Sequence, residues 1–152
     1  MARSLQATSD NNTSDIEAGK KVLRDAEDLI RAQQSFAVET TLSGSTYLKM
    51  ALRAKEAGFA VVVFFVGTTS VEINLARVRA RVKLGGHDVP EKDQRRRYPR
   101  TLANMRRLLP LADLAFIYDN STERGHTLVG VGSVGAMQWV EPAPEWVENV
   151  RS

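Results

Sequence analysis

The chain has 152 residues, with 21 lysines and arginines against 18 aspartates and glutamates, for a net charge of +3. Hydrophobic residues make up 43% and charged residues 26%, a composition that excludes collagen, coiled coils and a wholly disordered chain. Cysteine is absent, which excludes disulfides and thiolate metal sites and favours a reducing compartment. The longest apolar run, 59–66, is far shorter than the ~20 residues of a membrane helix. We therefore predict a single soluble, cytoplasmic domain without a membrane partner.

The positive charge is concentrated in one segment. Residues 77–107 hold eleven basic and three acidic side chains, a net charge of +8, so the remainder of the chain carries −5. Within this segment, four of the six residues 95–100 are arginines. Such a density of like charges is unfavourable on a helix without an anion, and guanidinium groups suit bidentate contacts with phosphate. The segment predicts an anionic partner: phosphates, nucleic acid or a membrane surface.

The first part of the chain predicts a helix followed by a strand. Residues 1–13 are polar and are expected to form a mobile N-terminal segment. Ser14 and Glu17 match a capping box, and apolar residues then recur as on one face of a helix that continues to about Gln34. Residues 35–41 are rich in β-branched and aromatic side chains and predict a strand.

A second helix and strand are expected in the middle of the chain. A turn at residues 43–44 leads into the helix, which Gly58 ends. Residues 59–66 are continuously apolar, which is typical of a strand in a parallel sheet that helices cover on both faces. Ser70 is placed to cap a third helix, which runs through Leu84 and stops at two glycines.

The last part of the chain predicts an arginine-rich helix and two strands. This fourth helix begins near Glu91, is kinked or restarted at Pro99 and ends before Pro110. Residues 114–118 and 127–131 are expected to be strands, and a short helix is expected after the two prolines of the tail. The order of the elements predicts a layered α/β fold.

Most familiar catalytic motifs are absent from the sequence. It contains no Walker A loop, no G-x-S-x-G elbow and no H-E-x-x-H helix. His87 and His126 lack neighbours at metal-ligand spacing and are interpreted as loop histidines. Residues 130–135 match G-x-G-x-x-G, but Pro142 and Pro144 interrupt any following helix, so we interpret these glycines as a strand end or turn.

An acid and two hydroxyls stand at the end of a predicted strand, at Glu39, Thr40 and Thr41. Ligands of open α/β sheets bind beyond the carboxyl ends of the strands. These three side chains are therefore candidates to orient a metal-bound water or a substrate hydroxyl. The alternative is a strand terminus that is merely solvated.

Four short motifs together resemble the zeta-toxin family of P-loop kinases, and more closely the bacterial branch often labelled predicted ABC-type ATPases. They are FAVETTLSG at 36–44, GGHDVP at 85–90, RRRYPR at 95–100 and Tyr-Asp-Asn around Asp119. The resemblance runs from about residue 16 to 121. It implies a three-layer α/β/α fold with a parallel sheet, and phosphoryl transfer from ATP or GTP with Mg2+. Characterised zeta toxins phosphorylate UDP-N-acetylglucosamine, which suggests a sugar-nucleotide substrate.

The family pattern also implies roles for particular residues. It places the substrate beside Glu39, Thr40 and Thr41. It places four arginines on a lid over the nucleotide phosphates: Arg81, Arg95, Arg97 and Arg100. His87 and Asp88 fall in the loop of that lid. The partner would be a nucleotide or a phosphorylated small molecule.

The chain departs from the family at its beginning. Family members start with a strand, a Walker A loop and a segment that carries the proposed catalytic aspartate, and this chain offers only 15 residues before the resemblance begins. We expect a partial kinase domain at 14–135 without the first strand and Walker A loop, a tail at 136–152 and no catalytic residue of its own. Phosphoryl transfer depends on the missing parts, so negligible kinase activity is expected. Loss of a central strand exposes sheet edges, which favour self-association or binding to an antitoxin.

Two other functions fit the same features. A nucleic-acid-binding module would use the basic segment 77–107, but Tyr98 is its one aromatic residue, so platforms for stacking bases are lacking and nucleic acid is the less favoured partner. An interaction protein would instead regulate a full-length homologue by exchanging helices and strands with it.

Overall fold

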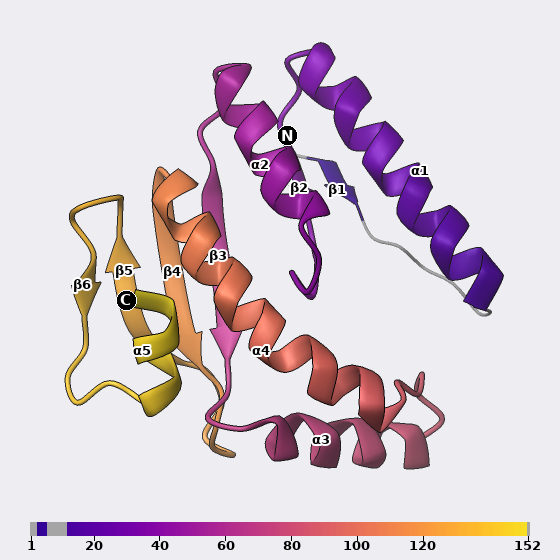
Figure 1. Cartoon of the computed structure of the whole chain (residues 1–152), viewed down its shortest axis with the longest axis vertical. Coiled ribbons are helices and arrows are strands. Elements are labelled where there is room, and N and C mark those ends of the chain that lie inside the picture. Colours follow the sequence, from indigo (N-terminus) through magenta and orange to yellow (C-terminus); the bar gives the residue numbers. More distant parts are fainter. Residues whose placement is uncertain (1–2, 6–11, 152) are drawn as a thin grey trace.

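The computed structural model describes residues 3–5 and 12–151, which form an α/β structure with five helices in the described part (Figure 1). In chain order the elements are β1 (Arg3–Leu5), α1 (Asn12–Arg31), β2 (Phe36–Val38), α2 (Thr46–Glu56), β3 (Val62–Gly67), α3 (Val71–Lys83), α4 (Glu91–Leu108), a 3-10 turn (Leu109–Leu111), β4 (Leu114–Asp119), β5 (Thr127–Gly132), β6 (Gln138–Trp139) and α5 (Glu145–Arg151). Apart from the short strands β1 and β6, the order of helices and strands is as predicted.

The described strands form two separate sheets. β1 pairs with β2 in parallel, and a four-stranded sheet has the order β3-β4-β5-β6. β3 and β4 are parallel, whereas β5 and β6 each run antiparallel to their neighbours. The larger sheet is therefore mixed, and the parallel pairing that the sequence predicts is found only at β1–β2 and β3–β4 among the described strands.

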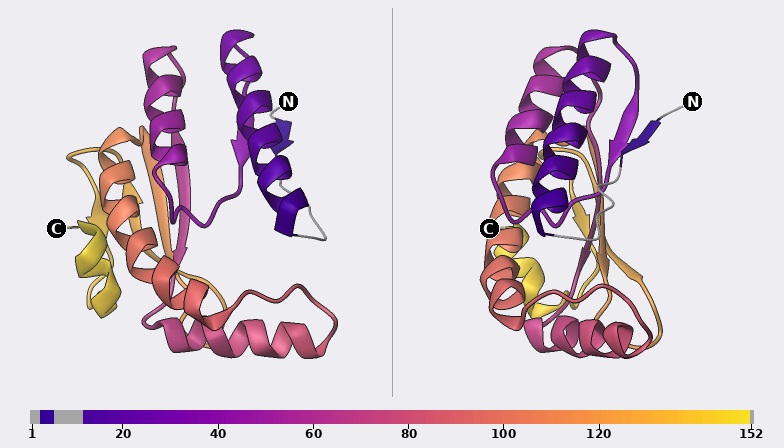
Figure 2. Two further views of the ribbon diagram at one scale, coloured as in Figure 1. Left: turned by 45° about the vertical axis from the view of Figure 1, so that its right-hand side comes forward. Right: turned by 90° about the vertical axis from the view of Figure 1, so that its right-hand side faces the viewer.

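The helices lie mainly on one side of the strands, where α1, α2, α4 and α5 form a layer (Figure 2). The main hydrophobic core lies between this layer and the larger sheet, and its fully buried members include Met105 of α4, Ile117 of β4 and Val147 of α5. A smaller cluster joins α1 and α2 to β2, with Ala26 and Ala54 buried at its centre.

The opposite face of β3 is uncovered. Phe65 points into the core and is 8% exposed, whereas Val62, Phe64 and Val66 are 49%, 67% and 49% exposed. The expectation that helices cover both faces of this strand is wrong for the described residues. A continuously apolar sequence is compatible with burial of both faces of a strand. Whether a helix actually covers each face depends on elements that are distant in the sequence.

Three details at the element ends differ from expectation. α1 begins at Asn12, before the predicted cap at Ser14, and of the predicted mobile segment 1–13 residues 3–5 form β1 while 1–2 and 6–11 lie outside the described residues. α4 is one helix through Pro99, so of the two outcomes expected there, a kink or a restart, the restart does not occur. No helix in the described ranges is long and apolar enough to span a bilayer.

The glycine-rich stretch 130–135 ends β5 and turns the chain into β6, which confirms the interpretation as a strand end and turn. Gly132 has a φ of +148°, and a Cβ there would lie 2.4 Å from the Ala136 carbonyl oxygen. The short strand β6 was not expected from the sequence.

Candidate functional site

A cavity of about 220 Å3 lies at the carboxyl edge of the larger sheet, and we call it the carboxyl-edge cavity. Its polar lining comes from the loops after β2 and β3 and from helices α3 and α4, at Thr41, Thr68, Asn74, Gln94, Arg97, Tyr98 and Thr101. This is the edge at which open α/β sheets bind ligands.

Helix α4 holds the two strand ends that border the carboxyl-edge cavity. The Tyr98 hydroxyl donates to the Thr68 carbonyl oxygen at 2.7 Å, and the Thr101 hydroxyl donates to the Thr41 carbonyl oxygen at 2.7 Å. Asn104 Nδ2 donates to the carbonyl oxygen of Leu42 at 2.8 Å. Burial, together with the nearby charges of Glu72 and Asp119, raises the pKa of Tyr98, so this hydroxyl stays a donor at neutral pH.

The loop after β3 is fixed by a second network. Asp119, at the end of β4, accepts hydrogen bonds from Trp146 Nε1 at 2.8 Å and from the Ser121 hydroxyl at 2.5 Å. The Ser121 oxygen in turn accepts from the Thr69 amide at 2.9 Å. Thr68 is 6% exposed, and its hydroxyl lies within hydrogen-bond distance of Asn74 Oδ1 at 3.3 Å. The cavity wall is therefore held by groups from β4 and α5 as well as α4.

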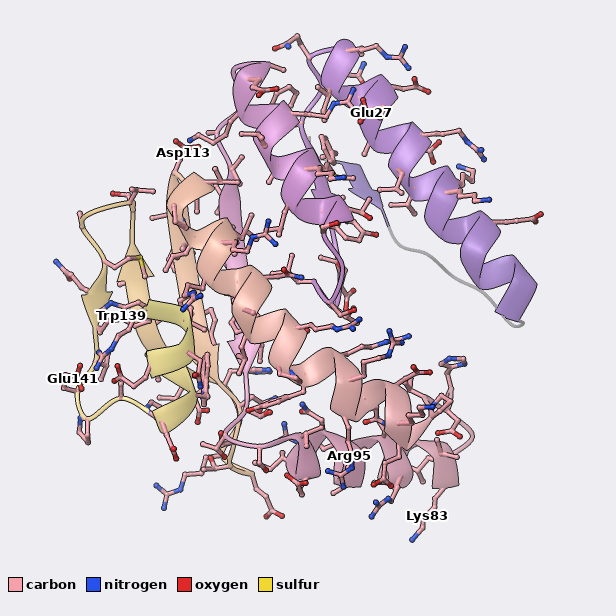
Figure 3. All side chains as sticks on the ribbon, viewed as in Figure 1. Glu27, Lys83, Arg95, Asp113, Trp139 and Glu141 are labelled. Atoms are coloured by element: carbon pink, nitrogen blue, oxygen red, sulfur yellow. The ribbon has the colours of Figure 1, made fainter. Side chains whose placement is uncertain are left out.

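Part of the basic segment is neutralised by acids. Arg95 lies between α4 and α3 and pairs with Glu72 at 2.7 Å and with Glu91 at 2.8 Å (Figure 3). Arg79 also contacts Glu91 at 3.1 Å, and Arg96 pairs with Asp93 at 2.6 Å. The hydrogen bonds from these arginines lower the pKa of all three carboxyl groups, and the two glutamates raise the pKa of Arg95.

The four arginines that the family pattern assigns to a lid have different surroundings. Arg97 is half-buried in the lining of the carboxyl-edge cavity and makes no hydrogen bond or ion pair within the described part of the chain. Arg100 is exposed outside that lining. Arg95 faces Glu72 and Glu91, and Arg81 donates to the His87 carbonyl oxygen at 3.1 Å. The structure thus brings one of the four, Arg97, to the cavity.

The predicted substrate residues divide between two cavities. Thr41 lines the carboxyl-edge cavity, whereas Glu39 and Thr40 line a larger cavity of about 620 Å3 between β2 and β3. The Thr40 hydroxyl accepts a hydrogen bond from the Leu42 amide at 3.0 Å, so it stabilises the local turn.

Sequence reasoning missed five polar lining residues: Thr68, Asn74, Gln94, Tyr98 and Thr101. For Thr68 a signal was present, because it follows an apolar strand just as Thr41 does. In the sequence, Tyr98 stands out only as the one aromatic residue of the basic segment. Within residues 3–5 and 12–151, no group of three or more histidine, aspartate or glutamate side chains is arranged to hold a metal ion.

Comparisons with known proteins give one relative and no activity. A Haemophilus influenzae protein that is itself described as uncharacterized is 42% identical to this chain over 85 residues. The match covers 56% of this chain and 61% of that protein, so the chain spans less than two thirds of the relative's length. No family model matches the chain, and no solved structure matches it.

Proposed function

We propose that the carboxyl-edge cavity binds the phosphates of a nucleotide or a phosphorylated small molecule, as part of a zeta-toxin-like phosphotransferase. The observation that carries this proposal is Arg97, a half-buried guanidinium in the cavity lining without a hydrogen bond or ion pair in the described part of the chain. Its neighbours Arg95 and Arg96 both have carboxylate partners. Asp93 is close enough to interact electrostatically with Arg97, but its carboxylate accepts its hydrogen bond from Arg96. A partly desolvated guanidinium is unfavourable without direct partners, and an incoming phosphate supplies them.

The other lining groups suit the same ligand. The Thr41 hydroxyl and the Asn74 side-chain amide nitrogen can donate hydrogen bonds to phosphate or ribose oxygens at the strand ends where such ligands bind. The Thr68 hydroxyl instead donates within the chain, to the Ser70 carbonyl or to Asn74 Oδ1, and so orients the Asn74 amide. The parallel pairs β1–β2 and β3–β4 agree with a P-loop kinase-like arrangement, which we propose as the parent fold. In such an enzyme Arg97 would neutralise charge on the transferred phosphoryl group.

The described residues fit a magnesium ion only as one carried by the nucleotide. Mg2+ is commonly bound through one or two carboxylates together with substrate phosphates and water. Carboxylates lie near the strand ends at Glu39 and Asp119, and the described ranges contain no preformed cluster of three metal-ligating side chains. When bound, the ion would neutralise phosphate charge, while Arg97, Thr41 and the Asn74 amide would orient the phosphates.

Binding without turnover is the expected behaviour of residues 1–152. The sequence contains no Walker A motif, and phosphoryl transfer depends on the phosphate cradle and the positioned nucleophile. We therefore expect Mg-ATP or Mg-GTP to bind, with no transfer of phosphate to water or to UDP-N-acetylglucosamine. Release of ADP above background by the purified chain would contradict this part of the proposal.

A binding titration with matched variants tests the site. Isothermal titration of Mg-ATP, Mg-GTP and inorganic pyrophosphate should show binding that Arg97→Gln weakens by about tenfold, since a charged hydrogen bond contributes about 1.5–3 kcal/mol. Arg106→Gln is the matched control: Arg106 is an exposed arginine of the same helix, outside the cavity and without an ion pair among the described residues. Equal losses in both variants would mean that only the overall charge attracts the ligand.

The same titration separates the nucleic-acid alternative. Binding to DNA should weaken steeply as salt rises, because counterions are released at every phosphate contacted. If duplex or single-stranded DNA bound more tightly than Mg-nucleotide at ordinary salt, and did so equally in the wild type and Arg97→Gln, the basic segment would be a nucleic-acid surface instead.

A further inference from the structure

Two sheet edges face one another across the larger cavity. β2 and β3 are joined by α2, and the strand orders of the two sheets give no pairing between them. The cavity of about 620 Å3 is lined by consecutive residues of both, 36–40 on one side and 59–65 on the other. We call this space the interstrand slot; it lies beneath α2, and Figure 2 shows β2 and β3 apart on the same side of the helices.

The backbone of β3 has hydrogen-bonding groups that face the slot. The Val61 carbonyl accepts from Asp113 and Leu114, and the Gly67 carbonyl accepts from Asn120, so these two residues face β4. Backbone groups of successive strand residues point to alternate edges. The amides and carbonyls of Val62, Phe64 and Val66 therefore point toward β2, where no described strand pairs with them. Unpaired groups of this kind form a template for another strand.

The size and chemistry of the slot fit an uncharged strand. From the rise per residue, the strand spacing and the sheet spacing, a strand fills roughly 160 Å3 per residue, so the slot holds about four. Its floor is apolar and comes from Met50, Ala51 and Ala54 of α2 with Met105 of α4. Glu39, at the mouth, is the one charged side chain in the lining, so a charged segment would find no partners along the floor.

No described part of this chain is free to fill the slot. Its apolar strands are all paired within the two sheets, so a second copy would have to unfold in order to lend one. We propose that the interstrand slot accepts an uncharged, apolar strand from a different polypeptide, which pairs with β2 and β3 together. The insertion would join the two sheets into one. This inference does not depend on phosphate binding.

Peptide binding to residues 1–152 tests the proposal. The probe is a fluorescein-labelled peptide of five alternating valines and alanines, with a lysine at each end for solubility. The control is the same peptide with N-methyl groups on alternate amides, which keeps the side chains but removes hydrogen bonds to an edge. We expect saturable binding by fluorescence anisotropy for the first peptide, and binding at least about tenfold weaker for the second. Equal affinities would overturn the proposal.

Hydrogen exchange shows where the peptide lies. The amides of Val62 and Phe64, which line the slot, should become protected when the peptide binds, together with amides of β2. Those of Val63 and Phe65 face β4 and serve as internal controls, with little change. Protection at β3 without any at β2, or at neither strand, would contradict insertion between them.

A cavity-filling variant gives an independent check. Ala51→Trp places a large side chain in the slot and should weaken peptide binding, whereas Ala103→Trp on the exposed face of α4 should not. The N-methylated peptide keeps the test decisive if Ala51→Trp fails to fold. Sedimentation of the wild type measures the rival occupant: concentration-dependent dimers that the peptide dissociates would assign the slot to a second copy and overturn the proposal.

Discussion

Gly67 is the residue that allows α5 to pack over the carboxyl end of β3. A Cβ at this position would lie 2.5–2.7 Å from three ring atoms of Trp146. Trp146 is 2% exposed, and its indole nitrogen donates to Asp119, so the ring cannot move aside without losing that hydrogen bond. The absence of a side chain at Gly67 therefore determines how closely the last helix approaches the candidate site.

Gly67→Ala should be destabilising for this reason. Overpacking of a tight contact commonly costs about 1–3 kcal/mol, and we expect a loss of that size in the free energy of unfolding. Urea denaturation followed by circular dichroism measures it. Gly44→Ala is the matched control, because a Cβ at Gly44 meets no atom within 4 Å. A loss no larger than in this control would show that the Trp146 ring adjusts freely.

Individual arginines show what sequence can and cannot provide. The contact of Arg95 with Glu91 follows from their spacing of four residues on one helix. The contact with Glu72 does not, because α3 and α4 meet only through the folded chain. The basic segment was correctly recognised as a dense cluster of like charges, but which arginine faces the cavity depends on how α4 is rotated against β3.

At the element scale, the ion pairs between α3 and α4 predict a dependence of stability on pH. Arginine contacts hold the pKa values of Glu72 and Glu91 below their ordinary value of 4.5. A carboxyl whose pKa is lowered by folding stabilises the folded state above its unfolded pKa, and this contribution disappears as the pH falls through the lowered value. The contribution of these ion pairs to the stability of the fold should therefore decrease below about pH 4.5 and remain constant above it.

Thermal unfolding at a series of pH values tests this expectation. The melting temperature of the wild type should fall as the pH decreases below 4.5. In the double variant Glu72→Gln and Glu91→Gln the fall should be shallower, because two of the carboxyl groups that cause it are gone. It should not disappear, because Asp93, Asp113 and Glu141 still have lowered pKa values. Identical slopes for the two proteins would show that the α3–α4 ion pairs do not support the fold. Since these carboxylates are exposed, the difference should be modest.

Local signals were sufficient for most helices and longer strands. Gly58 ends the second helix with a φ of +86°, and apolar runs indicated β3 and β4 to within a few residues. β1 and β6 were missed because two or three residues carry no periodicity, and such short strands are defined by the partner with which they pair. α4 continues through Pro99, and tertiary contacts hold the helix on both sides of the proline: Tyr98 donates to the Thr68 carbonyl, and Thr101 donates to the Thr41 carbonyl.

At the scale of the whole molecule, the uncovered face of the larger sheet carries an apolar surface. Phe64 stacks on Phe116 with ring centroids 4.9 Å apart and is still 67% exposed. The same face also exposes Val62 and Val66 of β3 and Leu128 of β5. Contiguous apolar surface of this kind favours association.

Phe64→Thr should reduce that association. Threonine keeps the preference for strand structure and removes most of the apolar surface, so light scattering at high protein concentration and fluorescence of a bound hydrophobic dye should both decrease. The free energy of unfolding should change by about 1 kcal/mol or less. Leu84→Thr removes an 89% exposed leucine from the turn after α3 and should have little effect on either signal. A similar decrease in both variants would show that no single face is responsible.

The arrangement of the candidate site was harder to predict than its residues. The sequence predicts a strand over 35–41 that ends in Glu39, Thr40 and Thr41, but β2 ends at Val38, and the three residues follow it in a loop. The structure then divides them between two cavities. That division arises because β2 and β3 do not pair, a relation between segments that are more than twenty residues apart. The uncovered face of β3 could not be predicted for the same reason, because it depends on where helices distant in the sequence pack.

The separation of β2 from β3 also has a consequence for folding cooperativity. No strand–strand hydrogen bond crosses from one described sheet to the other, so the first sheet and α1 are coupled to the rest mainly through the small cluster around Ala26 and Ala54 and the ion pair of Glu27 with Arg53. Units that share few contacts open separately. The N-terminal unit should therefore detach at a lower free energy than global unfolding requires, and a strand in the interstrand slot would make the two units unfold as one.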